Sequence, residues 1–572
     1  MAIGWRFPIR AAAIMWWAVI GKRVRARKRL GDLISQALDP YRYWVWRIEP
    51  QIESNEALEQ LVAGMRRRPT IAIVALCDVA NVRWLICVME ALQRQPYPHW
   101  QLLVPCDVVD IVASQSIRLG DTRIHAVHSL LTMRSSLLET DAEVVFPLDP
   151  TVIPSRCALV RIAAASDRKA MVFGDEDRLS PSGERYEAWF KPEWNEELAL
   201  AQNFLTGACA FDRLQALEAL PAQGELSDLA VYELAMRVAL AHSASVAHID
   251  HIIVHRLAPR CDMGRLACVA ALVEPRGGQV VSTGRSLIAI DWPLPDPLPL
   301  VTLIVPTRDK LEILQPCISS VRNLTDYRAY EIVVIDNGST GPDTLAYLAR
   351  LNLDPKIRVV RHNAPFNFSA ISNRGVDMAR GEFICLLNND TQVLSPDWLS
   401  QMMRHAVRPN VGAVGAKLLY SDYTIQHAGV AIGLGNAAGH SHRLQPDHEP
   451  GYHDLAHCTH FVSAVTGACL LVSKRKFLDA GGLDSEHLAV AYNDIDFCLR
   501  LEQSGWRNVY EPRARLLHLE SKSRGSDFNP ANNERYMREL AVFQARWNTT
   551  RAIDPLHHRL LDRSSETFRL LI

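Results

Sequence analysis

Three aspartates and one histidine in the second half of the chain have the types and settings that could do chemistry. Asp336 follows the apolar run EIVVI, and Asp390 closes the polar triplet that begins at Asn388, after the run FICLL. Buried amides and carboxylates are costly unless something pairs with them. A carboxylate there suits a hard divalent cation, which in turn neutralises a diphosphate. An ordinary turn residue would explain either aspartate taken alone.

A second acidic group stands in the stretch AYNDIDFCLRLEQSGW. Asp494 and Asp496 lie at the start of a predicted helix, where acidic residues often only complement the helix dipole. Because they lie on a different element from Asp390, one carboxylate could accept a proton from a hydroxyl while another holds a metal. His518 ends a later apolar stretch and could complete the metal's coordination. By itself it would be a structural histidine.

Strands of a parallel sheet must position these groups. In open parallel sheets, ligands bind at the carboxyl ends of the strands. Asp336 and Asp390 both follow β-rich apolar runs, and Ser395 with Pro396 then predicts a helix N-cap and first helical residue. We therefore expect the polar groups to line one edge of one sheet.

The chain repeats one αβ unit in tandem. Apolar runs begin at Thr70 and at Val301, and TGAC occurs at 206–209 and at 466–469. The arginine of VYELAMR and the last histidine of HIIVH are 18 positions apart (255 − 237), as are those of DIDFCLR and ARLLH (518 − 500). Such self-similarity marks a repeated structural unit, and alternating strands and helices predict a mostly parallel, helix-covered sheet in each copy.

The length of 572 residues is too great for one core, so the chain is expected to divide into domains. We predict an N-terminal helical segment (1–67), a first αβ domain (68–260), a linker (261–299), a second αβ domain (300–547) and a C-terminal tail (548–572). The linker includes the proline-rich stretch DWPLPDPLPLV, which favours an extended backbone.

Composition describes an ordinary globular protein. Hydrophobic residues make up 48% of the chain and charged residues 22%, and the net charge is −1. A net charge so close to zero gives no overall electrostatic attraction for nucleic acid, so we expect no nucleic-acid partner. The 12 cysteines lack metal-finger spacing and lie within apolar runs, which is typical of small core residues in a reducing compartment.

The stretch 9–30 is first apolar and then basic. It reads IRAAAIMWWAVIGKRVRARKRL, with six cations between Lys22 and Arg29 and no acidic residue before Asp32. The apolar part is short for a bilayer span, and no small-residue cleavage pattern supports a signal peptide. A helix lying on the membrane surface, with Trp16 and Trp17 at the lipid boundary, fits better. A packing helix with a solvated basic end is an equal alternative.

The region from about Val301 to Trp547 resembles the family 2 glycosyltransferases with the GT-A fold, especially bacterial cell-surface polysaccharide enzymes. The matching stretches, in order, are VTLIVPTRDK, EIVVIDNGS, PFNFSAISNRG, GEFICLLNNDTQVLSPDWL, VGAVGAKLLY, IQHAGV, VSAVTGACLLV, GGLD, YNDIDFCLRL and HLESKSRG. The stretch from Thr70 to His255 resembles such a domain too. The resemblance implies an α/β fold with two tandem GT-A domains, which are Rossmann-like domains of nucleotide-diphospho-sugar transferases.

The resemblance also implies roles for particular residues. Asp494 matches the catalytic base, Asp390 the carboxylate that meets the metal and diphosphate, and His518 a histidine near the metal. Asn388 departs from the first aspartate of the family's D-x-D pattern, although an amide oxygen can still accept or ligate. The residues implied for nucleotide binding are Pro306, Thr307, Asp309, Asp336, Asn373, Asn388 and Asn389, and further site candidates are Lys417, Asp496 and His427.

The implied activity is transfer of a hexosyl or deoxyhexosyl group from a nucleotide-sugar donor to a glycan or lipid-linked acceptor in cell-surface polysaccharide synthesis. Mg²⁺ or Mn²⁺ is the expected cofactor. One displacement, with Asp494 as base, inverts the anomeric carbon; the sequence offers no nucleophile for a retaining route. We expect the protein in the cytoplasm, on the inner face of the cytoplasmic membrane.

The first copy departs from the second at its key positions. Asp149 aligns with Asp390, but Cys106 aligns with Asp336 and the two asparagines are replaced by Pro147 and Leu148. The sequence therefore predicts a degenerate domain, kept for packing, acceptor binding or partner contact.

The base of the first copy is also replaced. With Arg237 aligned on Arg500, Val231 lies opposite Asp494, and valine cannot accept a proton, although the terminal His255 survives. The alternative is a second active transferase whose base is Glu233 or Asp228.

Two other classes of protein compete with this interpretation. A nucleotide-dependent dehydrogenase needs a glycine-rich turn after its first strand, and VPTRDK has none. A non-catalytic glycan- or nucleotide-binding scaffold would require the second site to be broken, yet its aspartates and histidine are all present.

Overall fold

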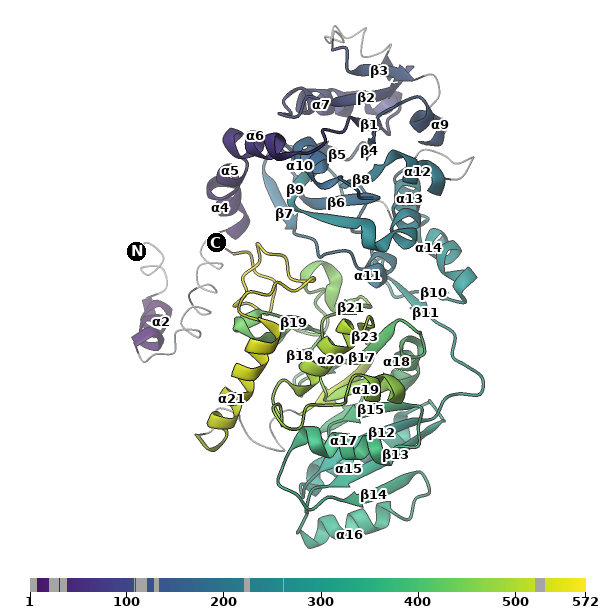
Figure 1. The fold of residues 1–572 in the computed structure, drawn as a ribbon, viewed down its shortest axis with the longest axis vertical. Helices are drawn as coiled ribbons and strands as arrows, with labels where there is room; N and C mark the ends of the chain where they lie inside the picture. Colours follow the sequence, from purple (N-terminus) through teal and green to yellow (C-terminus); the bar gives the residue numbers. More distant parts are fainter. Residues whose placement is uncertain are drawn as a thin grey trace. The chain divides into compact units, whose positions relative to one another are not determined.

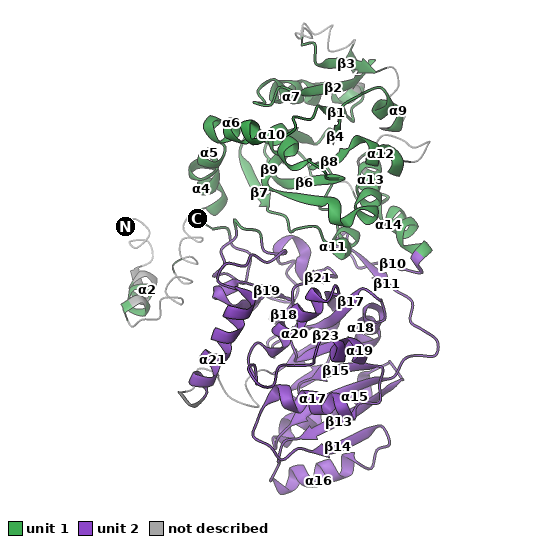
Figure 2. Ribbon diagram, viewed as in Figure 1, with its two compact units in different colours: residues 1–275, 558–560, 570–572 green, residues 276–557, 561–569 purple. Residues whose placement is uncertain are grey.

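The computed structural model describes residues 8–19, 30, 39–106, 108–109, 121–127, 133–220, 227–260, 262–519 and 530–571. It divides into two compact units, shown in Figure 2. Unit 1 comprises 1–275, 558–560 and 570–572, and unit 2 comprises 276–557 and 561–569.

Unit 1 is built around one nine-stranded sheet. Its strands are β1 (Ile71–Ala75), β2 (Trp100–Pro105), β3 (Ile124–Val127), β4 (Val144–Leu148), β5 (Val152–Pro154), β6 (Met171–Leu179), β7 (Arg185–Trp189), β8 (Cys209–Asp212) and β9 (Val246–Arg256). Its helices are α2 (Pro8–Val19), α4 (Pro40–Arg47), α5 (Glu49–Ile52), α6 (Asn55–Gly64), α7 (Val82–Gln93), α9 (Met133–Leu138), α10 (Ala158–Ala165), α11 (Glu196–Ala201), α12 (Arg213–Ala219), α13 (Asp228–Ala241) and α14 (Arg265–Val273).

Unit 2 holds a ten-stranded sheet and two small two-stranded sheets. Its strands are β10 (Gln279–Ser282), β11 (Ile288–Asp291), β12 (Val301–Thr307), β13 (Tyr330–Asp336), β14 (Ile357–Arg361), β15 (Phe383–Leu387), β16 (Thr391–Val393), β17 (Val411–Leu419), β18 (Ile425–His427), β19 (Val430–Ile432), β20 (Ala438–His440), β21 (His460–Val462), β22 (Cys469–Ser473) and β23 (Arg507–His518). Its helices are α15 (Leu311–Leu324), α16 (Pro342–Leu351), α17 (Phe368–Met378), α18 (Trp398–Ala406), α19 (Lys474–Asp479), α20 (Asn493–Gln503) and α21 (Pro530–Trp547).

The two large sheets have one topology. The strand order is β3-β2-β1-β4-β8-β6-β9-β5 in unit 1 and β14-β13-β12-β15-β22-β17-β23-β16 in unit 2. Figure 1 labels β1 to β9 in unit 1 and β12 to β15, β17 and β23 in unit 2. In both sheets, the first four strands in this order pair parallel with one another. The next two strand pairs are antiparallel (β4–β8 and β8–β6; β15–β22 and β22–β17), and the pair after them is parallel (β6–β9; β17–β23). The predicted α/β class with tandem, mostly parallel sheets is confirmed.

Continuous apolar runs explain the central strands. β1, β13 and β17 are buried at every position, as expected when helices cover both faces of a parallel sheet. Gly375 lets helix α17 approach β12, because a Cβ at this position would lie 2.3 Å from the Ile304 side chain. This close packing holds the sheet edge at which β12 and β15 end.

The segment 261–299, predicted as a linker, contains regular structure. It includes α14 and the hairpin formed by β10 and β11, whereas 292–299 has no helix or strand. The division between the units falls after Pro275. Residues 548–571 form turns and irregular backbone; 558–560 belong to unit 1 and 561–569 to unit 2.

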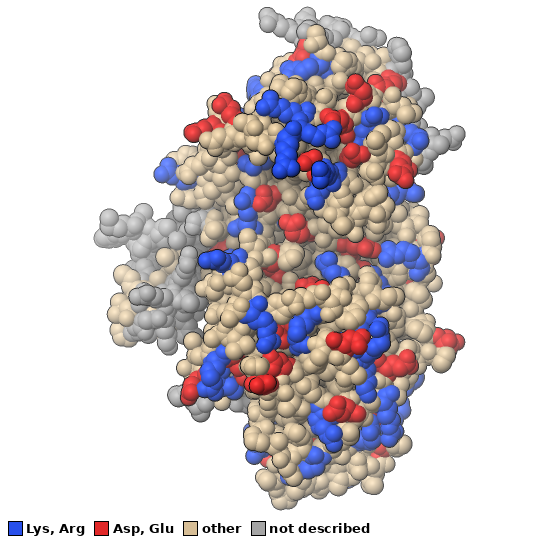
Figure 3. Space-filling view, viewed as in Figure 1, with Lys and Arg blue, Asp and Glu red and all other residues tan. Residues whose placement is uncertain are grey.

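The N-terminal apolar stretch forms helix α2, in which Trp16 is 62% and Val19 81% exposed. Among the described residues, no helix combines the length and apolar character needed to cross a membrane. The basic residues 22–29, on which the predicted membrane contact also depends, lie outside the described part of the chain. On the visible face in Figure 3, basic and acidic side chains of the described residues are interspersed.

Candidate active site

A cavity of about 640 Å³ lies in unit 2, at the sheet edge where β12 and β15 end. Its walls bring together seven residues that the sequence singled out: Pro306, Thr307, Asn388, Asn389, Asp390, Asp494 and His518. Other residues of the wall had no such signal, among them Phe366, Gln426, His440, Arg443, Gly467, Tyr492 and Tyr536. The cavity has the size of a small-molecule site.

The polar triplet connects the ends of two neighbouring strands. Asn389 donates from Nδ2 to Thr307 Oγ1 at 3.0 Å, which joins the segment that follows β15 to the end of β12. Asn389 and Asp390 are buried, at 7% and 2% exposure. The strand register thus places the carboxylate in the wall of the cavity, as the sequence predicted for a group at a carboxyl edge.

Asp390 and His518 meet across the cavity wall. The carboxylate Oδ1 lies 3.2 Å from His518 Nε2, because β16 pairs with β23 in a register that sets Thr391 beside His518. Asn388 Nδ2 is 3.3 Å from the same nitrogen. Neighbouring ligands of an octahedral Mg²⁺ with 2.0–2.1 Å bonds are about 2.9 Å apart. One carboxylate oxygen and one imidazole nitrogen at nearly this spacing fit a divalent cation.

Asp494 is held by backbone amides at the opening turn of helix α20. Its Oδ2 accepts from Gly467 N–H at 2.7 Å and its Oδ1 from Ile495 N–H at 2.9 Å. Burial raises the pKa of the Asp494 carboxyl, while these hydrogen bonds oppose the rise. Backbone groups of two segments, the turn at Gly467 and the start of α20, therefore orient the carboxylate.

Helix α21 supports the loop that leads into α20. Tyr492 has a left-handed backbone (φ 63°), which is strained for a residue with a side chain. Its ring stacks on Phe543 at 4.8 Å, and its hydroxyl lies 2.7 Å from that of Tyr536. Glu539 accepts the N–H groups of Val490 and Ala491. These contacts fix the backbone immediately before Asp494.

Two predicted nucleotide-binding aspartates lie on the same sheet edge, outside the cavity wall. Asp309 accepts the N–H groups of Thr340 and Gly341 at 2.9 and 2.8 Å. The Gly341 N–H is the main cause that lowers the pKa of Asp309. Asp336 accepts Ser339 N–H at 2.9 Å and pairs with the Arg361 guanidinium.

Three other candidates have local partners instead. Asn373 Nδ2 donates to Leu483 O at 2.8 Å, and its Oδ1 accepts Leu483 N–H at 3.0 Å. Lys417 is buried and pairs with Asp447 at 2.6 Å. Asp496 is fully buried and accepts from Arg500, Arg546 and Trp547 at 2.9, 2.8 and 2.9 Å. None of the three lines the cavity, and these contacts hold elements of unit 2 together.

His427 stands behind the cavity wall. It is fully buried, and its Nδ1 lies 2.9 Å from Nδ1 of His440, which itself lines the cavity. Burial lowers the pKa of His427 well below its usual range.

The equivalent place in unit 1 is filled by an arginine. Gly207 corresponds to Gly467 in the TGAC repeat, and a Cβ at Gly207 would lie 2.4 Å from the Arg256 guanidinium. Arg256 is buried and pairs with Glu176, to which Lys191 is also paired at 2.9 Å. In unit 2 the neighbours of the corresponding glycine are Asp494 and Phe368.

Of the two base alternatives in unit 1, the structure describes the side chain of Glu233 alone. Val231 is buried. Glu233 pairs with Arg237 at 2.7 Å on the exposed side of α13. The side chain of Asp228 lies outside the described part of the structure. Asp149 accepts Thr151 N–H at 2.7 Å, and His255 pairs with Asp177 at 2.5 Å.

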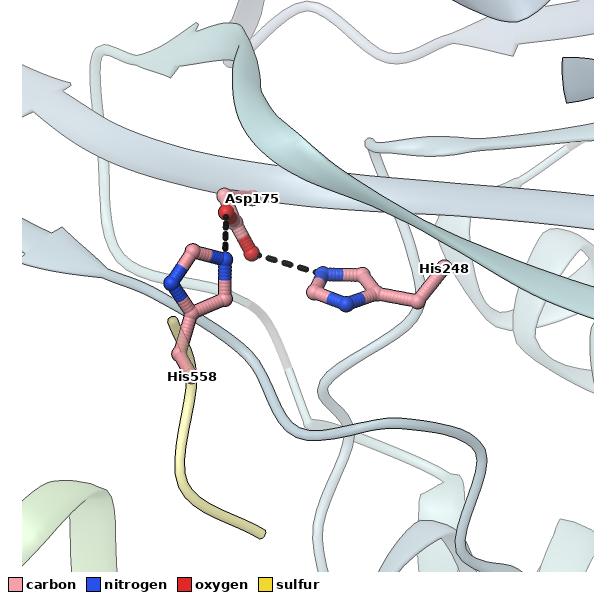
Figure 4. A group of neighbouring side chains, drawn as sticks. All are labelled: Asp175, His248 and His558. Atoms are coloured by element: carbon pink, nitrogen blue, oxygen red, sulfur yellow. Dashed lines mark hydrogen bonds and ion pairs between the residues drawn. The ribbon is translucent and has the colours of Figure 1, made fainter. Parts of the chain in front are cut away.

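A second cluster of metal-ligand types lies in unit 1 (Figure 4). Asp175 Oδ1 is 2.8 Å from His248 Nε2, and Asp175 Oδ2 is 3.0 Å from His558 Nε2. Burial alone would raise the pKa of Asp175, but the two imidazoles hold it below its usual range. Asp175 in turn raises the pKa of His248 to about 9, against the effect of burial.

The tautomer of His558 does not fit a metal in this cluster. Leu560 N–H donates to His558 Nδ1 at 3.1 Å, so a neutral His558 carries its proton on Nε2, which faces Asp175. A metal-bound histidine instead donates its second ring N–H to an acceptor. The cluster is therefore better described as a buried carboxylate clamped by two imidazoles.

Comparison with known proteins supports the interpretation of unit 2. Residues 302–459 match the model of the family described as Glycosyl transferase family 2. The chain is 32% identical over 536 residues to an uncharacterized protein of Sinorhizobium fredii, covering 88% of this chain and 58% of that protein. It is 29% identical over 532 residues to the O-antigen biosynthesis protein RfbC of Myxococcus xanthus, covering 86% and 40%.

A shorter similarity is to the N-acetylglucosaminyl-diphospho-decaprenol L-rhamnosyltransferase of Mycobacterium tuberculosis, 26% identical over 262 residues (41% of this chain, 79% of that protein). The chain thus spans about half the length of the first two relatives. Residues 302–459 are similar to glycosyl transferase family 2, and the predicted resemblance is confirmed over these residues. Asp494 and His518 lie beyond the matched residues.

Proposed function

We propose that unit 2 is an inverting glycosyltransferase that moves a sugar from a nucleoside-diphosphate donor to a hydroxyl of a glycan or lipid-linked acceptor. The observation that carries the proposal is the single cavity that holds both a buried carboxylate and a cation-binding pair. Asp494 stands on one element, and Asp390 and His518 on two others. A base and a separate diphosphate-binding group are what direct displacement requires.

Different residues of the cavity would act as the base and bind the cation. Asp494 accepts the proton of the acceptor hydroxyl as that oxygen attacks the anomeric carbon, and its raised pKa brings it closer to the range in which a base works well. Asp390 and His518 would hold Mg²⁺ or Mn²⁺, with Asn388 beside them. Such a cation, when bound, neutralises charge on a diphosphate leaving group. Asp309 and Asp336 hold the edge against which the nucleoside is expected to lie.

The names of the relatives support the substrate class. One is an O-antigen biosynthesis protein, and another is a rhamnosyltransferase named for a diphospho-decaprenol acceptor. We therefore propose a hexosyl or deoxyhexosyl donor and a role in cell-surface polysaccharide synthesis.

We propose that unit 1 is non-catalytic. Where unit 2 has Asp494 beside a glycine, unit 1 has the buried Arg256 paired with Glu176. A guanidinium cannot act as a base near neutral pH. A second active site in unit 1 would need a base other than Glu233, which pairs with Arg237.

We further propose that the protein works in the cytoplasm, where residues 9–30 bind it peripherally to the inner face of the membrane. The exposed Met15, Trp16 and Val19 of helix α2 support this proposal, because such side chains favour the lipid boundary.

The experiment for this proposal is a donor screen with the full chain. Nucleoside diphosphates (UDP, dTDP and GDP) are tested in the presence of Mn²⁺ for protection against thermal unfolding. At least one should protect the wild type and lose its effect in Asp390→Ala. Equal melting curves with and without every nucleotide would contradict a nucleotide-sugar site.

A further inference from the structure

Gln426 is an extra residue in strand β18. Leu418 of β17 pairs with His427 of β18, but the next residue of β17, Leu419, pairs with Ile425, so that Gln426 is passed over. One residue too many on one strand of an antiparallel pair is a β-bulge, which bends the strand and re-aims the side chain of the added residue. Gln426 is also a residue of the cavity wall in unit 2.

The side-chain amide of Gln426 is buried with an unmet acceptor. The residue is 4% exposed, and its Oε1 has no hydrogen-bond partner among the residues that the structure describes. Such a group destabilises the fold, because it loses its bonds to water and gains none in exchange. In the wall of a cavity, the acceptor can be satisfied by a ligand that carries an N–H or O–H group.

The strand order places Gln426 away from the expected nucleoside site. Asp309 and Asp336 hold that site at the ends of β12 and β13, and the sheet then continues as β15, β22 and β17, with β18 beside β17. Only β17 separates β18 from β23, which ends at His518 of the cation-binding pair. Two strand spacings amount to about 10 Å. A ligand that extends from β12 and β13 past this pair therefore reaches β18 with the end opposite to its nucleoside.

We infer that Gln426 is a ligand-binding residue that recognises a hydroxyl of the transferred sugar. In a nucleotide sugar, the diphosphate lies between the nucleoside and the sugar, so the sugar is the group that follows the cation-binding pair along the sheet edge. The oxygens of an ionised diphosphate only accept hydrogen bonds and cannot satisfy Oε1. A sugar hydroxyl both donates and accepts, so it can pair with the amide in either orientation of its two-fold last torsion. This inference rests on the proposed function of the cavity.

Binding is tested in the full chain with Gln426→Met, which keeps the length of the side chain and removes its hydrogen-bonding atoms. With Mn²⁺ present, the affinity for UDP, dTDP or GDP should stay at the wild-type value. The affinity for the hexose or deoxyhexose conjugate of the nucleotide that binds should fall about 3- to 10-fold, the effect of one lost hydrogen bond between neutral groups. An unchanged affinity for the conjugate, or an equal loss for the nucleoside diphosphate alone, would overturn the inference.

Gln401 of helix α18 provides a matched control. It is also buried, at 9% exposure, and its Oε1 also lacks a hydrogen-bond partner among the described residues. Its Nε2 donates to Asp397 at 2.8 Å, and it does not belong to the cavity wall. Gln401→Met should therefore bind the nucleotide and its sugar conjugate like the wild type. A loss as large as that of Gln426→Met would show that removal of any buried amide has this effect, and it would contradict a contact with the sugar.

Conjugates that lack one hydroxyl of the sugar identify the group that is bound. One of them should bind the wild type about 3- to 10-fold more weakly than the parent conjugate, and it should bind Gln426→Met as well as the parent does. If no such conjugate binds the wild type more weakly, or if each removal weakens both proteins alike, Gln426 does not contact the transferred sugar.

The melting temperature without ligand separates this inference from the proposed function. Because Oε1 is unmet in the free protein, Gln426→Met should melt at the wild-type temperature or above it. A clearly lower melting temperature would show that the amide serves the fold, and it would overturn the inference whether or not a nucleotide binds. If no nucleotide or conjugate binds the wild type, the proposed function fails. Normal binding of the conjugate by Gln426→Met refutes the inference alone.

Discussion

The carboxylate of Asp494 accepts the backbone N–H of Gly467 at 2.7 Å, and this contact points a group with a raised pKa into the cavity of unit 2. The second residue of helix α20 and a turn 27 positions earlier in the chain thus cooperate to place one carboxylate.

Asp494→Asn should abolish transfer and leave donor binding intact. The amide keeps the shape and can still accept the Gly467 N–H, but it cannot take a proton from the acceptor. Loss of a general base costs about 10²–10⁴-fold in rate. Turnover is measured by release of nucleoside diphosphate, and binding by thermal protection. Full turnover in the variant would place the base elsewhere.

The pH profile of the wild type should reflect the raised pKa of Asp494. The base must be ionised, so kcat/KM should fall as the pH drops through a value above that of an ordinary aspartate, about 3.9. Asp494→Glu, which moves the carboxylate by one methylene, should keep a profile of the same form at a lower rate. A profile that is flat down to the ordinary aspartate range would contradict Asp494 as the base.

Removal of divalent metal should stop transfer, and Mn²⁺ or Mg²⁺ should restore it. The reason is the 3.2 Å pair of Asp390 and His518, which has the spacing and donor atoms of two metal ligands. Asp390→Ala should weaken nucleotide binding as well as turnover. Asp447→Ala, which removes a carboxylate paired with Lys417, is the matched control and should keep the metal response. Undiminished transfer in excess chelator would contradict a divalent metal bound by Asp390 and His518.

Glu502 should make unit 2 less stable as the pH rises. Burial raises its pKa to about 8 from 4.5, against the opposing effect of Arg507. Between these values the folded state keeps a proton that the unfolded state releases, so the free energy of unfolding falls with rising pH. Glu502→Gln should melt like the wild type near about pH 4.5 and at a higher temperature near about pH 8. If the variant and the wild type melted at the same temperature at both pH values, the Glu502 carboxyl would be solvated and its pKa would not be raised.

The N-terminal segment should give reversible attachment to anionic membranes. Each basic residue near the surface contributes about 1 kcal/mol, and the apolar side chains of α2 add to this. Vesicles containing phosphatidylglycerol should bind the full chain and release part of it in high salt. A chain starting at Asp32 should stay in solution. If both forms bind alike, α2 packs on the protein; if only detergent releases the full chain, the segment crosses the bilayer.

Much of the fold could be predicted from the sequence because it is set by patterns that repeat. The spacing from Arg237 to His255 and from Arg500 to His518 predicted two copies of one unit, and the sheets share their strand order. The carboxyl edge also followed from local rules, since Asp390 closes the polar triplet that follows the apolar strand β15. A fold assigned from periodicity needs no knowledge of side-chain contacts.

The contacts that complete the site could not be predicted in this way. Asp496 resembled a second site acid, but its partners Arg546 and Trp547 lie 50 and 51 positions away on α21. The His440 ring meets His427 only after two short strands fold back on one another. Arg256, which fills the place beside Gly207 in unit 1, carries no signal in the sequence. Such pairings depend on tertiary packing and have no local pattern.

The most direct test of the central claim is nucleoside-diphosphate release from a panel of nucleotide sugars by the full chain with Mn²⁺. The panel includes UDP-, dTDP- and GDP-linked hexoses and deoxyhexoses, with wild type, Asp494→Asn and Asp390→Ala in parallel. We expect the wild type to release nucleoside diphosphate from at least one donor and both variants to release none, which would leave unit 1 without activity. Release that persists in both variants, or no release and no binding with any donor, would contradict a transferase site in unit 2.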